Sequence, residues 1–505
     1  MFGIMLIGAA FGAIDLWRPI DGTTREMWRE CDVGSIARNY YRDGMHFLYP
    51  QVDWRGDGPG YVEMEFPVYP YMIAVGYKVF GFHEQIGRVL SFIFTLVTLF
   101  LVLRLAEYTM PPPGAALAAL FYAVSPLTIR LANAIQPEPL MMMAYVGAVY
   151  AFIRWLEEDR WLWYWSCMAF TALAILAKAP AAHLGVVYLF FLLWRGGWAA
   201  FKRPRLWVLG AASLVPGILW YAHARNFYKI YGNSLGASNH QHVVGLATFT
   251  DPKYILGIAT LEYHFIWHAA GLVALLVGAA LVMRSKPRWP VFGYAGLWYL
   301  GILVFYLVIA GTSSYDWARY YHIVSMAPAA LLIGGIGGLA WARWRDSRAL
   351  AGVAALASVA ALVSAVRLTW HERHWHLEMP TYETAKTFEP LMQPGVLIAA
   401  SGHHCISKTV SDYNTSWYFY WTDHKGFTPC VQEHTMANVQ SLIGRGARYF
   451  IVEQAVMAER PDFAAAMRAT YPALAETKVA VLFKLEGSGP SPAGGPAPAG
   501  APGAS

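Results

Sequence analysis

Long apolar windows separated by short charged links dominate the first 370 residues of the chain. Windows such as Ala115 to Ile129 and Gly271 to Met283 contain no charged residue. A membrane-spanning helix needs about 20 mostly apolar residues, because the hydrocarbon core is about 30 Å thick and the helix rises about 1.5 Å per residue. We therefore expect many transmembrane helices.

The first of these helices is expected at the N-terminus. Met1 to Leu16 lacks a basic stretch and a convincing cleavage site, so we expect an uncleaved helix there rather than a removed signal peptide. Ten further windows are expected to span the membrane at roughly 84–106, 112–132, 139–156, 161–178, 180–196, 206–224, 264–283, 290–311, 319–341 and 348–367. The pattern predicts a polytopic α-helical membrane protein with about 11 transmembrane helices.

The segment 67–82 decides the topology of the chain. It is apolar but short and contains two prolines, so it suits a helix at the membrane surface as well as a span. If it does not cross, three basic loops share one side, which the positive-inside rule makes cytoplasmic: Arg195 to Arg205, Arg284 to Arg288 and Trp341 to Arg348. We prefer this topology, which places residues 17–66, residues 225–262 and everything after residue 370 outside.

Composition supports a membrane location. Hydrophobic residues make up 57% of the chain and charged residues 14%, which is too few to cover a water-facing surface. The net charge of +6 reflects loop topology rather than nucleic-acid binding. The 4 cysteines contain no C-x-x-C pair that would suggest zinc, although Cys405 and Cys430 could pair in an oxidising compartment.

After Arg367 the pattern changes to short apolar strands and amphipathic helices. We expect strands at Gly395 to Ala400, Ala447 to Val452 and Val479 to Leu485, and helices at 431–443 and 454–470. These elements predict a small extracytoplasmic α/β domain over residues 371–486, followed by a disordered Gly/Pro/Ala tail over 487–505. The aromatic run Ser416 to Trp421 could stack on sugar rings, but a buried strand or a membrane contact is the better interpretation.

The first outer loop, residues 17–66, gathers the largest number of polar residues. Its segment Arg29 to Asp43 has helical periodicity, because four apolar positions, Val33, Ile36, Ala37 and Tyr40, fall on one face. Asp32 lies near the start of this helix, where the helix dipole favours a carboxylate. Taken alone, Asp32 could be a cap or a surface partner of Arg29.

This loop resembles the first outer loop of bacterial relatives of the dolichyl-phosphate-mannose protein mannosyltransferases, which have the GT-C glycosyltransferase fold. The likeness covers residues 1–200 and weakens beyond them. The residues that carry it are Asp32-x3-Ile36-Ala37-Arg38-Asn39, Gly44, Tyr49-Pro50, Asp53-Trp54-Arg55-Gly56, Glu65-Phe66-Pro67-x-Tyr69-Pro70-Tyr71, Gly81 to Arg88, Ser125-Pro126 to Pro139 and Ala177-Lys178-Ala179-Pro180.

The resemblance implies an inverting transferase that moves a sugar from a polyprenyl-phosphate donor to a protein, a cell-envelope glycan or a lipid. It implies Asp32 as general base and Glu138 as the second acidic residue, although Glu138 could merely complement a helix dipole. The residues expected to contact substrate are Lys178, Arg319, Tyr320, Glu65, Arg225 and Arg130, with snorkelling as the alternative for the cations. If a divalent cation takes part, Asp32 and Glu138 are its candidate ligands.

Two departures from related aminoarabinose transferases stand out. Those enzymes have a Lys-Pro-Pro motif where this chain has Glu65-Phe66-Pro67, so a phosphate contact made by that lysine must come from elsewhere. They also pair Asp and Glu ahead of the loop helix, whereas Cys31 separates Glu30 from Asp32 here.

The expected location is the bacterial inner membrane, with the active site facing outward and lipid, not nucleic acid, as the surroundings. A transporter or flippase of a lipid-linked precursor is the alternative. It predicts ionisable residues near the middle of the spans and internal repeats, whereas the acidic residues here gather in an outer loop.

Overall fold

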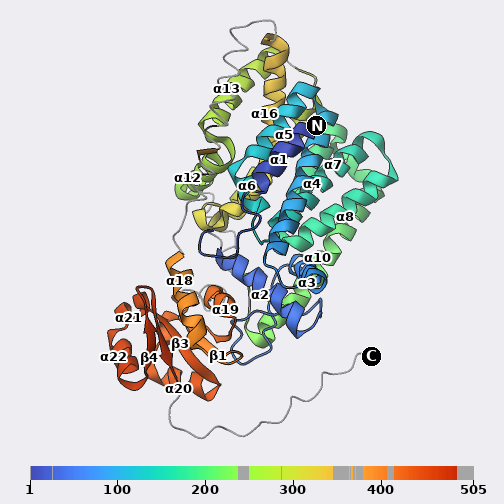
Figure 1. Ribbon diagram of the computed structural model, residues 1–505. Helices are drawn as coiled ribbons and strands as arrows, with labels where there is room; N and C mark the ends of the chain where they lie inside the picture. Colours follow the sequence, from blue (N-terminus) through green and yellow to red (C-terminus); the bar gives the residue numbers. More distant parts are fainter. Residues whose placement is uncertain are drawn as a thin grey trace.

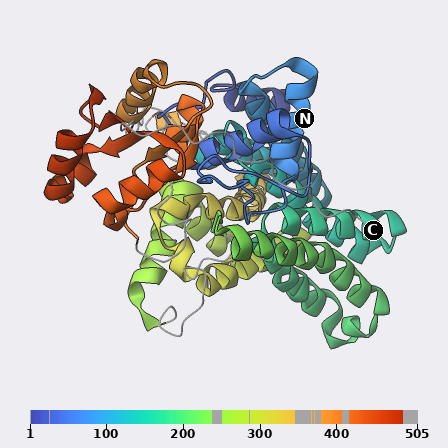
Figure 2. The same ribbon diagram turned by 90° about the horizontal axis from the view of Figure 1, so that it is seen from below.

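The computed structural model describes residues 2–24, 27–236, 250–285, 287–344, 363, 366–367, 370, 379–405 and 415–485. Long helices form a bundle, and a smaller domain built around a sheet lies against one end of it (Figure 1). Seen from below, this domain lies to one side of the bundle rather than beneath its centre (Figure 2).

The helices of the bundle and its outer loops follow the chain order closely. They are α1 (Phe2–Gly12), α2 (Met27–Asp43), α3 (Val68–Phe80), α4 (Gln85–Thr109), α5 (Pro112–Val124), α6 (Pro126–Ala132), α7 (Glu138–Glu158), α8 (Trp161–Ala177), η1 (Ala179–His183), α9 (Leu184–Gly196), η2 (Gly197–Lys202), α10 (Pro204–Tyr231), α12 (Pro252–Leu261), η4 (Glu262–Trp267), α13 (His268–Ser285), α14 (Pro290–Val308), α15 (Ala310–Ser313), η5 (Asp316–His322) and α16 (Ile323–Trp344). Many begin at a proline, whose fixed φ and missing N–H suit the first turn of a helix.

Fewer helices are long enough to cross a membrane than the eleven expected. The described residues contain 6 such helices, or up to 8 if each of two bent pairs forms one span. The expected span at 348–367 lies outside the described residues apart from positions 363, 366 and 367. Helix α3 has 13 residues, fewer than the roughly 20 needed to cross.

Two windows expected as single spans are broken. The window 112–132 bends by 59° between α5 and α6, because Ser125 precedes a proline and takes an extended conformation. The window 264–283 belongs to a pair that bends by 94°, where the π-helical turn η4 ends and His268 has a positive φ of 51°. Periodicity could not show either break, because both lie inside continuous apolar sequence.

Small residues let two helices of the bundle approach closely. A Cβ atom added to Gly114 of α5 would lie 2.7 Å from the carbonyl oxygen of Gly334 in α16, and one added to Gly334 would lie 2.5 Å from the carbonyl oxygen of Gly114. Close backbone approach at small residues is a common way for helices to pack where lipid removes the hydrophobic driving force.

The smaller domain contains a five-stranded mixed sheet in the order β2-β1-β3-β5-β4. Strand β1 is parallel to β2 and β3, whereas β5 is antiparallel to β3 and β4. Its elements are α18 (Met379–Phe388), η6 (Glu389–Leu391), β1 (Leu397–Ala400), α19 (Ser416–Thr422), β2 (Lys425–Phe427), η8 (Val431–Glu433), α20 (Met436–Gly444), β3 (Ala447–Glu453), α21 (Gln454–Glu459), α22 (Pro461–Thr470), β4 (Ala473–Glu476) and β5 (Ala480–Lys484).

The three expected strands form β1, β3 and β5, but the short strands β2 and β4 were not expected. The interpretation of Ser416 to Trp421 as a strand or a membrane contact was wrong. This run forms the helix α19, and all of its residues are buried. The helix at 431–443 begins as the short turn η8, and the one at 454–470 is split into α21 and α22.

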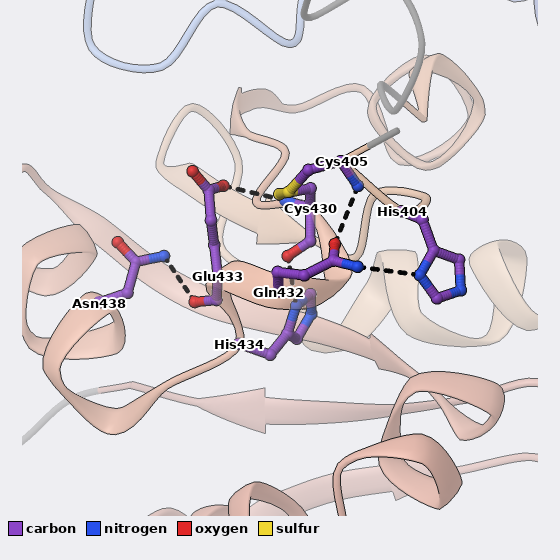
Figure 3. Close-up of a disulfide and its surroundings, with 7 residues drawn as sticks. All are labelled: His404, Cys405, Cys430, Gln432, Glu433, His434 and Asn438. Atoms are coloured by element: carbon purple, nitrogen blue, oxygen red, sulfur yellow. Dashed lines mark hydrogen bonds between the residues drawn. A yellow bond between two sulfur atoms is a disulfide. The ribbon is translucent and has the colours of Figure 1, made fainter. Parts of the chain in front are cut away.

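Cys405 and Cys430 form a disulfide beside β1 and η8 (Figure 3). The Gln432 side chain accepts a hydrogen bond from the Cys405 backbone N–H at 2.9 Å and donates one to His404 at 3.1 Å. Glu433 accepts a hydrogen bond from the Cys430 backbone N–H at 3.0 Å. The disulfide therefore holds the loop that follows β1 against the start of η8.

Helix α2 joins the bundle to the smaller domain. The Arg38 guanidinium donates to Asp53 at 2.6 Å and to the carbonyl oxygen of Tyr420 in α19 at 3.0 Å. Ser416 of α19 donates to the carbonyl oxygen of Trp28 at 2.8 Å. These contacts fix the position of α2 from the side of the smaller domain.

From the bundle side, α2 is held by a buried ion pair. The guanidinium of Arg88 in α4 lies 3.2 Å from the Glu30 carboxylate and donates to the carbonyl oxygens of Arg18, Pro19 and Asn133. Arg88 and Glu30 are each 1% exposed. Both charges are desolvated, so each depends on the other.

We expect Arg88→Met to destabilise the protein by about 3–5 kcal/mol, because it leaves the Glu30 carboxylate buried without its cation. Thermal unfolding in detergent measures the effect. Arg104→Met is the control on the same helix, because Arg104 pairs with Glu107 at an exposed site. Equal unfolding temperatures for the two variants would contradict the role given to the buried pair.

Candidate active site

A pocket opens where α2 meets the loop before α3 and the start of α7. It is lined by Trp28, Arg29, Asp32, Val33, Met64, Glu65, Phe66, Pro70, Pro137 and Leu235. Arg29 and Asp32 are three residues apart in α2, so they lie on the same face of the helix. Periodicity within the first outer loop thus brings a cation and a carboxylate into one pocket.

Asp32 is a buried carboxylate in this pocket, with 2% of its surface exposed. The Trp54 indole N–H donates a hydrogen bond to its Oδ1 at 2.8 Å. Burial raises the pKa of Asp32 to about 7, although the Trp54 hydrogen bond and the Arg29 charge act in the opposite direction. A carboxylate with a pKa near neutrality can both accept and release a proton, which suits a general base.

Two cations and two carboxylates, Arg29, Lys178, Glu65 and Glu138, lie next to Asp32 and form a four-charge cluster. Arg29 Nη2 donates to Glu65 Oε1 at 2.6 Å and lies 3.8 Å from Glu138 Oε1. Lys178 Nζ donates to Glu138 Oε1 and lies 3.6 Å from Glu65 Oε1. Each cation therefore contacts both carboxylates.

The four charges come from four parts of the chain. Glu138 is the first residue of α7, and Lys178 follows the last residue of α8. The Phe66 backbone N–H donates to the carbonyl oxygen of Leu176 at 3.0 Å, which ties the loop carrying Glu65 to the end of α8. The cluster thus lies at helix termini rather than along the middle of a span.

Burial differs among the four groups. Glu138 is fully buried, and Lys178 and Arg29 are 3% and 7% exposed. The Glu65 side chain is 16% exposed and is the most accessible of the four. Burial alone would raise the pKa of Glu65, but the charges of Arg29 and Lys178 lower it to about 2, so Glu65 is ionised at neutral pH.

Aromatic rings from η5 cover the cations. Lys178 Nζ lies 4.8 Å from the ring centre of Tyr320 and 5.0 Å from that of Tyr321. The Arg29 guanidinium lies 5.5 Å from the centre of the Tyr320 ring. Cations over aromatic faces at these distances attract the ring, so η5 closes the cluster on one side.

A buried hydrogen-bond network holds η5 in place. His322, the last residue of η5, has its Nδ1 2.5 Å from the Glu262 carboxylate and its Nε2 2.8 Å from the carbonyl oxygen of Ser313. Ser325 also donates to Glu262 at 3.0 Å. Glu262 belongs to the π-helical turn, so the break in that window supplies a carboxylate that anchors the segment carrying Tyr320.

Five of the predicted site residues meet here: Asp32, Glu65, Glu138, Lys178 and Tyr320. The interpretation of Asp32 as a surface partner of Arg29 was wrong, because Asp32 is buried and Arg29 forms its ion pairs with the two glutamates.

The other three predicted residues lie apart from the four-charge cluster. The guanidinium of Arg319 lies over the Phe265 ring at 5.2 Å and 3.8 Å from Asp316. Arg225 lies 3.6 Å from Glu63 and over the Tyr228 ring. Arg130 lies in α6. Their substrate contacts stay predictions.

Two residues of the site were missed as site residues from sequence. Arg29 was considered only as a partner for Asp32, and Trp54 was quoted in a motif without a role. The signal for Arg29 was present, because a glutamate at position 65 in place of a lysine requires a cation from elsewhere. Among the described residues, no three His, Cys, Asp or Glu side chains converge on a point where a metal could bind.

The arrangement is that of a GT-C membrane protein with a buried carboxylate beside paired cations, and comparisons with known proteins agree on the fold. Residues 59–221 match the family described as dolichyl-phosphate-mannose-protein mannosyltransferase. No curated protein sequence gives a significant match to this chain.

The structure is similar to that of ArnT from Cupriavidus metallidurans bound to undecaprenyl phosphate, with 16% identity and a TM-score of 0.62 over 97% of this chain and 100% of that one. The apo state of ArnT gives a TM-score of 0.64 at 16% identity, over 97% and 99% of the two chains. The archaeal oligosaccharyltransferase AglB from Archaeoglobus fulgidus, in complex with an inhibitory peptide and a dolichol-phosphate, gives 0.57 at 11% identity over 94% and 72%. This chain therefore has the GT-C fold of the mannosyltransferase and ArnT superfamily.

The pKa of Asp32 predicts a pH-dependent cost to stability. Because folding raises this pKa from 3.8 to about 7, ionisation of Asp32 increasingly disfavours the folded state as the pH rises between these values. A tenfold change in the proton affinity of a group is equivalent to roughly 1.4 kcal/mol of stability. We therefore expect Asp32→Asn, which keeps an acceptor for Trp54, to be more stable than wild type at pH 8 and to lose most of that advantage at pH 4.

Unfolding temperatures of wild type and variant across this range measure the difference. Asp57→Asn is the control, because the hydrogen bond from Arg445 lowers the pKa of this half-exposed carboxyl and its replacement should give no such gain. A difference between wild type and Asp32→Asn that does not change with pH would contradict the raised pKa.

Proposed function

We propose that this protein is an inverting glycosyltransferase that moves a sugar from a polyprenyl-phosphate donor to an acceptor hydroxyl at the outer face of the membrane. One observation carries the proposal: a buried carboxylate with a pKa near 7 shares a pocket with the edge of a cluster that contains two cations. The fold shared with ArnT bound to undecaprenyl phosphate supports the same reaction class. The acceptor is a protein, a cell-envelope glycan or a lipid.

In the proposed reaction, the acceptor oxygen attacks the anomeric carbon from the side opposite the phosphate. The bond between that carbon and the phosphate oxygen breaks as the new glycosidic bond forms, so a single displacement inverts the configuration. Asp32 takes the proton of the acceptor hydroxyl, and polyprenyl phosphate leaves with the electron pair. Arg29 and Lys178 stabilise the charge that develops on the phosphate.

A transporter or flippase is the alternative function. It would place ionisable groups near the middle of the spans, where a substrate crosses. The four-charge cluster lies at the ends of α7 and α8, at the same end of the bundle as α2 and the smaller domain (Figure 1). This placement favours chemistry at one face over passage through the membrane.

The orientation of the protein follows from the two ends of the bundle. Glu157, near the far end of α7 from Glu138, pairs with Arg195 at 2.6 Å and accepts a hydrogen bond from Tyr294. The basic loop after Arg195 therefore lies at the end opposite to the pocket, and the positive-inside rule makes that end cytoplasmic. A disulfide in the smaller domain is consistent with an oxidising compartment on the pocket side.

We expect Asp32→Asn to lower the rate of transfer by about 10²- to 10⁴-fold, because the variant cannot accept the acceptor proton. The wild-type rate should rise with pH and level off above about 7, following ionisation of Asp32. Transfer from a purified panel of polyprenyl-phosphate sugars in detergent, with Asp57→Asn as the control, measures both effects. Activity of Asp32→Asn within a few-fold of wild type would remove Asp32 as the base.

Labelling with a membrane-impermeant thiol reagent tests the orientation. Asp57, 46% exposed in its side chain, lies in the first outer loop, and Trp198, 78% exposed, lies in the basic loop. We expect the Asp57→Cys variant to react in intact cells and the Trp198→Cys variant to react only after the membrane is opened. The reverse pattern would place the pocket in the cytoplasm and exclude the proposed face.

A further inference from the structure

The four-charge cluster is electrically balanced within the protein. Two cations, Arg29 and Lys178, face two carboxylates, Glu65 and Glu138, at distances of 3.8 Å or less. Cations that are to bind a phosphate from a lipid donor therefore already have anionic partners. Inside a low-dielectric site, a further anion binds well only if one of these carboxylates gives up its contacts.

The two carboxylates differ in how easily they could move. Glu138 is fully buried and begins α7 between Pro137 and Pro139. Glu65 lies in an irregular segment before α3, lines the pocket together with Asp32, and retains 16% exposure of its side chain. An anion that enters through the pocket meets Glu65 first.

Arg29 has hydrogen-bonding capacity that Glu65 does not use. Its Nε is buried without a hydrogen-bond partner among the described residues, although Nη2 donates to Glu65 at 2.6 Å. The Arg29 side chain is 8% exposed and lines the pocket. A phosphate offers three acceptor oxygens and can take two parallel N–H groups of a guanidinium while also facing an ammonium. Phosphate is thus a better match for Arg29 and Lys178 than the one oxygen of Glu65.

We propose that Glu65 is a displaceable internal anion that holds Arg29 and Lys178 in the position of the donor phosphate and yields this position when a polyprenyl phosphate binds. The inference rests on the proposed function and adds a competition that the protein builds into its own site. Glu65 keeps the buried cations paired when no lipid phosphate is bound, and it weakens phosphate binding because it must be displaced. It also fits a chain that carries glutamate where related enzymes carry lysine.

Binding of undecaprenyl phosphate to the purified full chain in detergent tests this inference. Glu65→Gln removes the competing charge and keeps the size of the side chain, so we expect its Kd to fall by about tenfold relative to wild type, equivalent to about 1.4 kcal/mol. Glu65→Asp keeps the charge and should retain the wild-type Kd within about threefold. If Glu65→Gln folds poorly, a comparison of Glu65→Asp with a Glu65→Ala variant gives the same contrast.

Glu63→Gln is the matched control, because Glu63 is also buried in this segment and also faces an arginine, Arg225, at 3.6 Å. We expect its Kd for undecaprenyl phosphate to equal that of wild type. A Kd for Glu65→Gln that equals or exceeds the wild-type value would overturn the inference and make Glu65 a residue that positions Arg29 for binding. Absence of saturable binding to wild type would remove the proposed function itself, which is a different and recognisable result.

Discussion

The desolvated pairing of Arg29 and Lys178 with Glu65 and Glu138 is the constraint on which the site depends. Removing such charges from water is expensive, and only their mutual attraction and good geometry offset the cost. Each of the four comes from a different part of the chain, so the cluster cannot form until α2, the loop before α3, α7 and the end of α8 are all in place. Correct assembly of the bundle and assembly of the site are therefore the same event.

Helix α2 transmits this constraint in three directions. Arg29 and Asp32 face the pocket, Glu30 binds Arg88 of the bundle, and Arg38 binds Asp53 and α19 of the smaller domain. A movement of the smaller domain would pull on the helix that carries Asp32. The position of the carboxylate is thus set jointly by both parts of the protein, and a change at the surface of α19 could alter the chemistry in the pocket.

The sequence predicted the class of the protein and the main carboxylate for good physical reasons. Long uncharged windows specify membrane helices, and the periodicity of residues 29–43 specified a helix that brings Asp32 to its start. The breaks after Val124 and Trp267 were not predictable, because hydropathy measures composition and not backbone direction. The aromatic run in α19 was misread, because a short, fully buried apolar segment has no period that separates a helix from a strand.

Contacts between distant residues account for the rest of what the sequence could not show. Glu138 and Lys178 could be singled out separately, but nothing in their spacing showed that they pair. Arg29 was overlooked because its partner Glu65 lies 36 residues away. The exposed or buried state of Asp32 also depended on Trp54 and α19, which only the folded chain places against it.

A structure of the protein with undecaprenyl phosphate bound tests the central claim most directly. We expect the phosphate to lie within hydrogen-bonding distance of Arg29 and Lys178, the Glu65 side chain to be displaced from Arg29, and the Asp32 carboxylate to face the same pocket. A phosphate held instead by Arg225 or Arg319, with the contact between Arg29 and Glu65 intact, would contradict it.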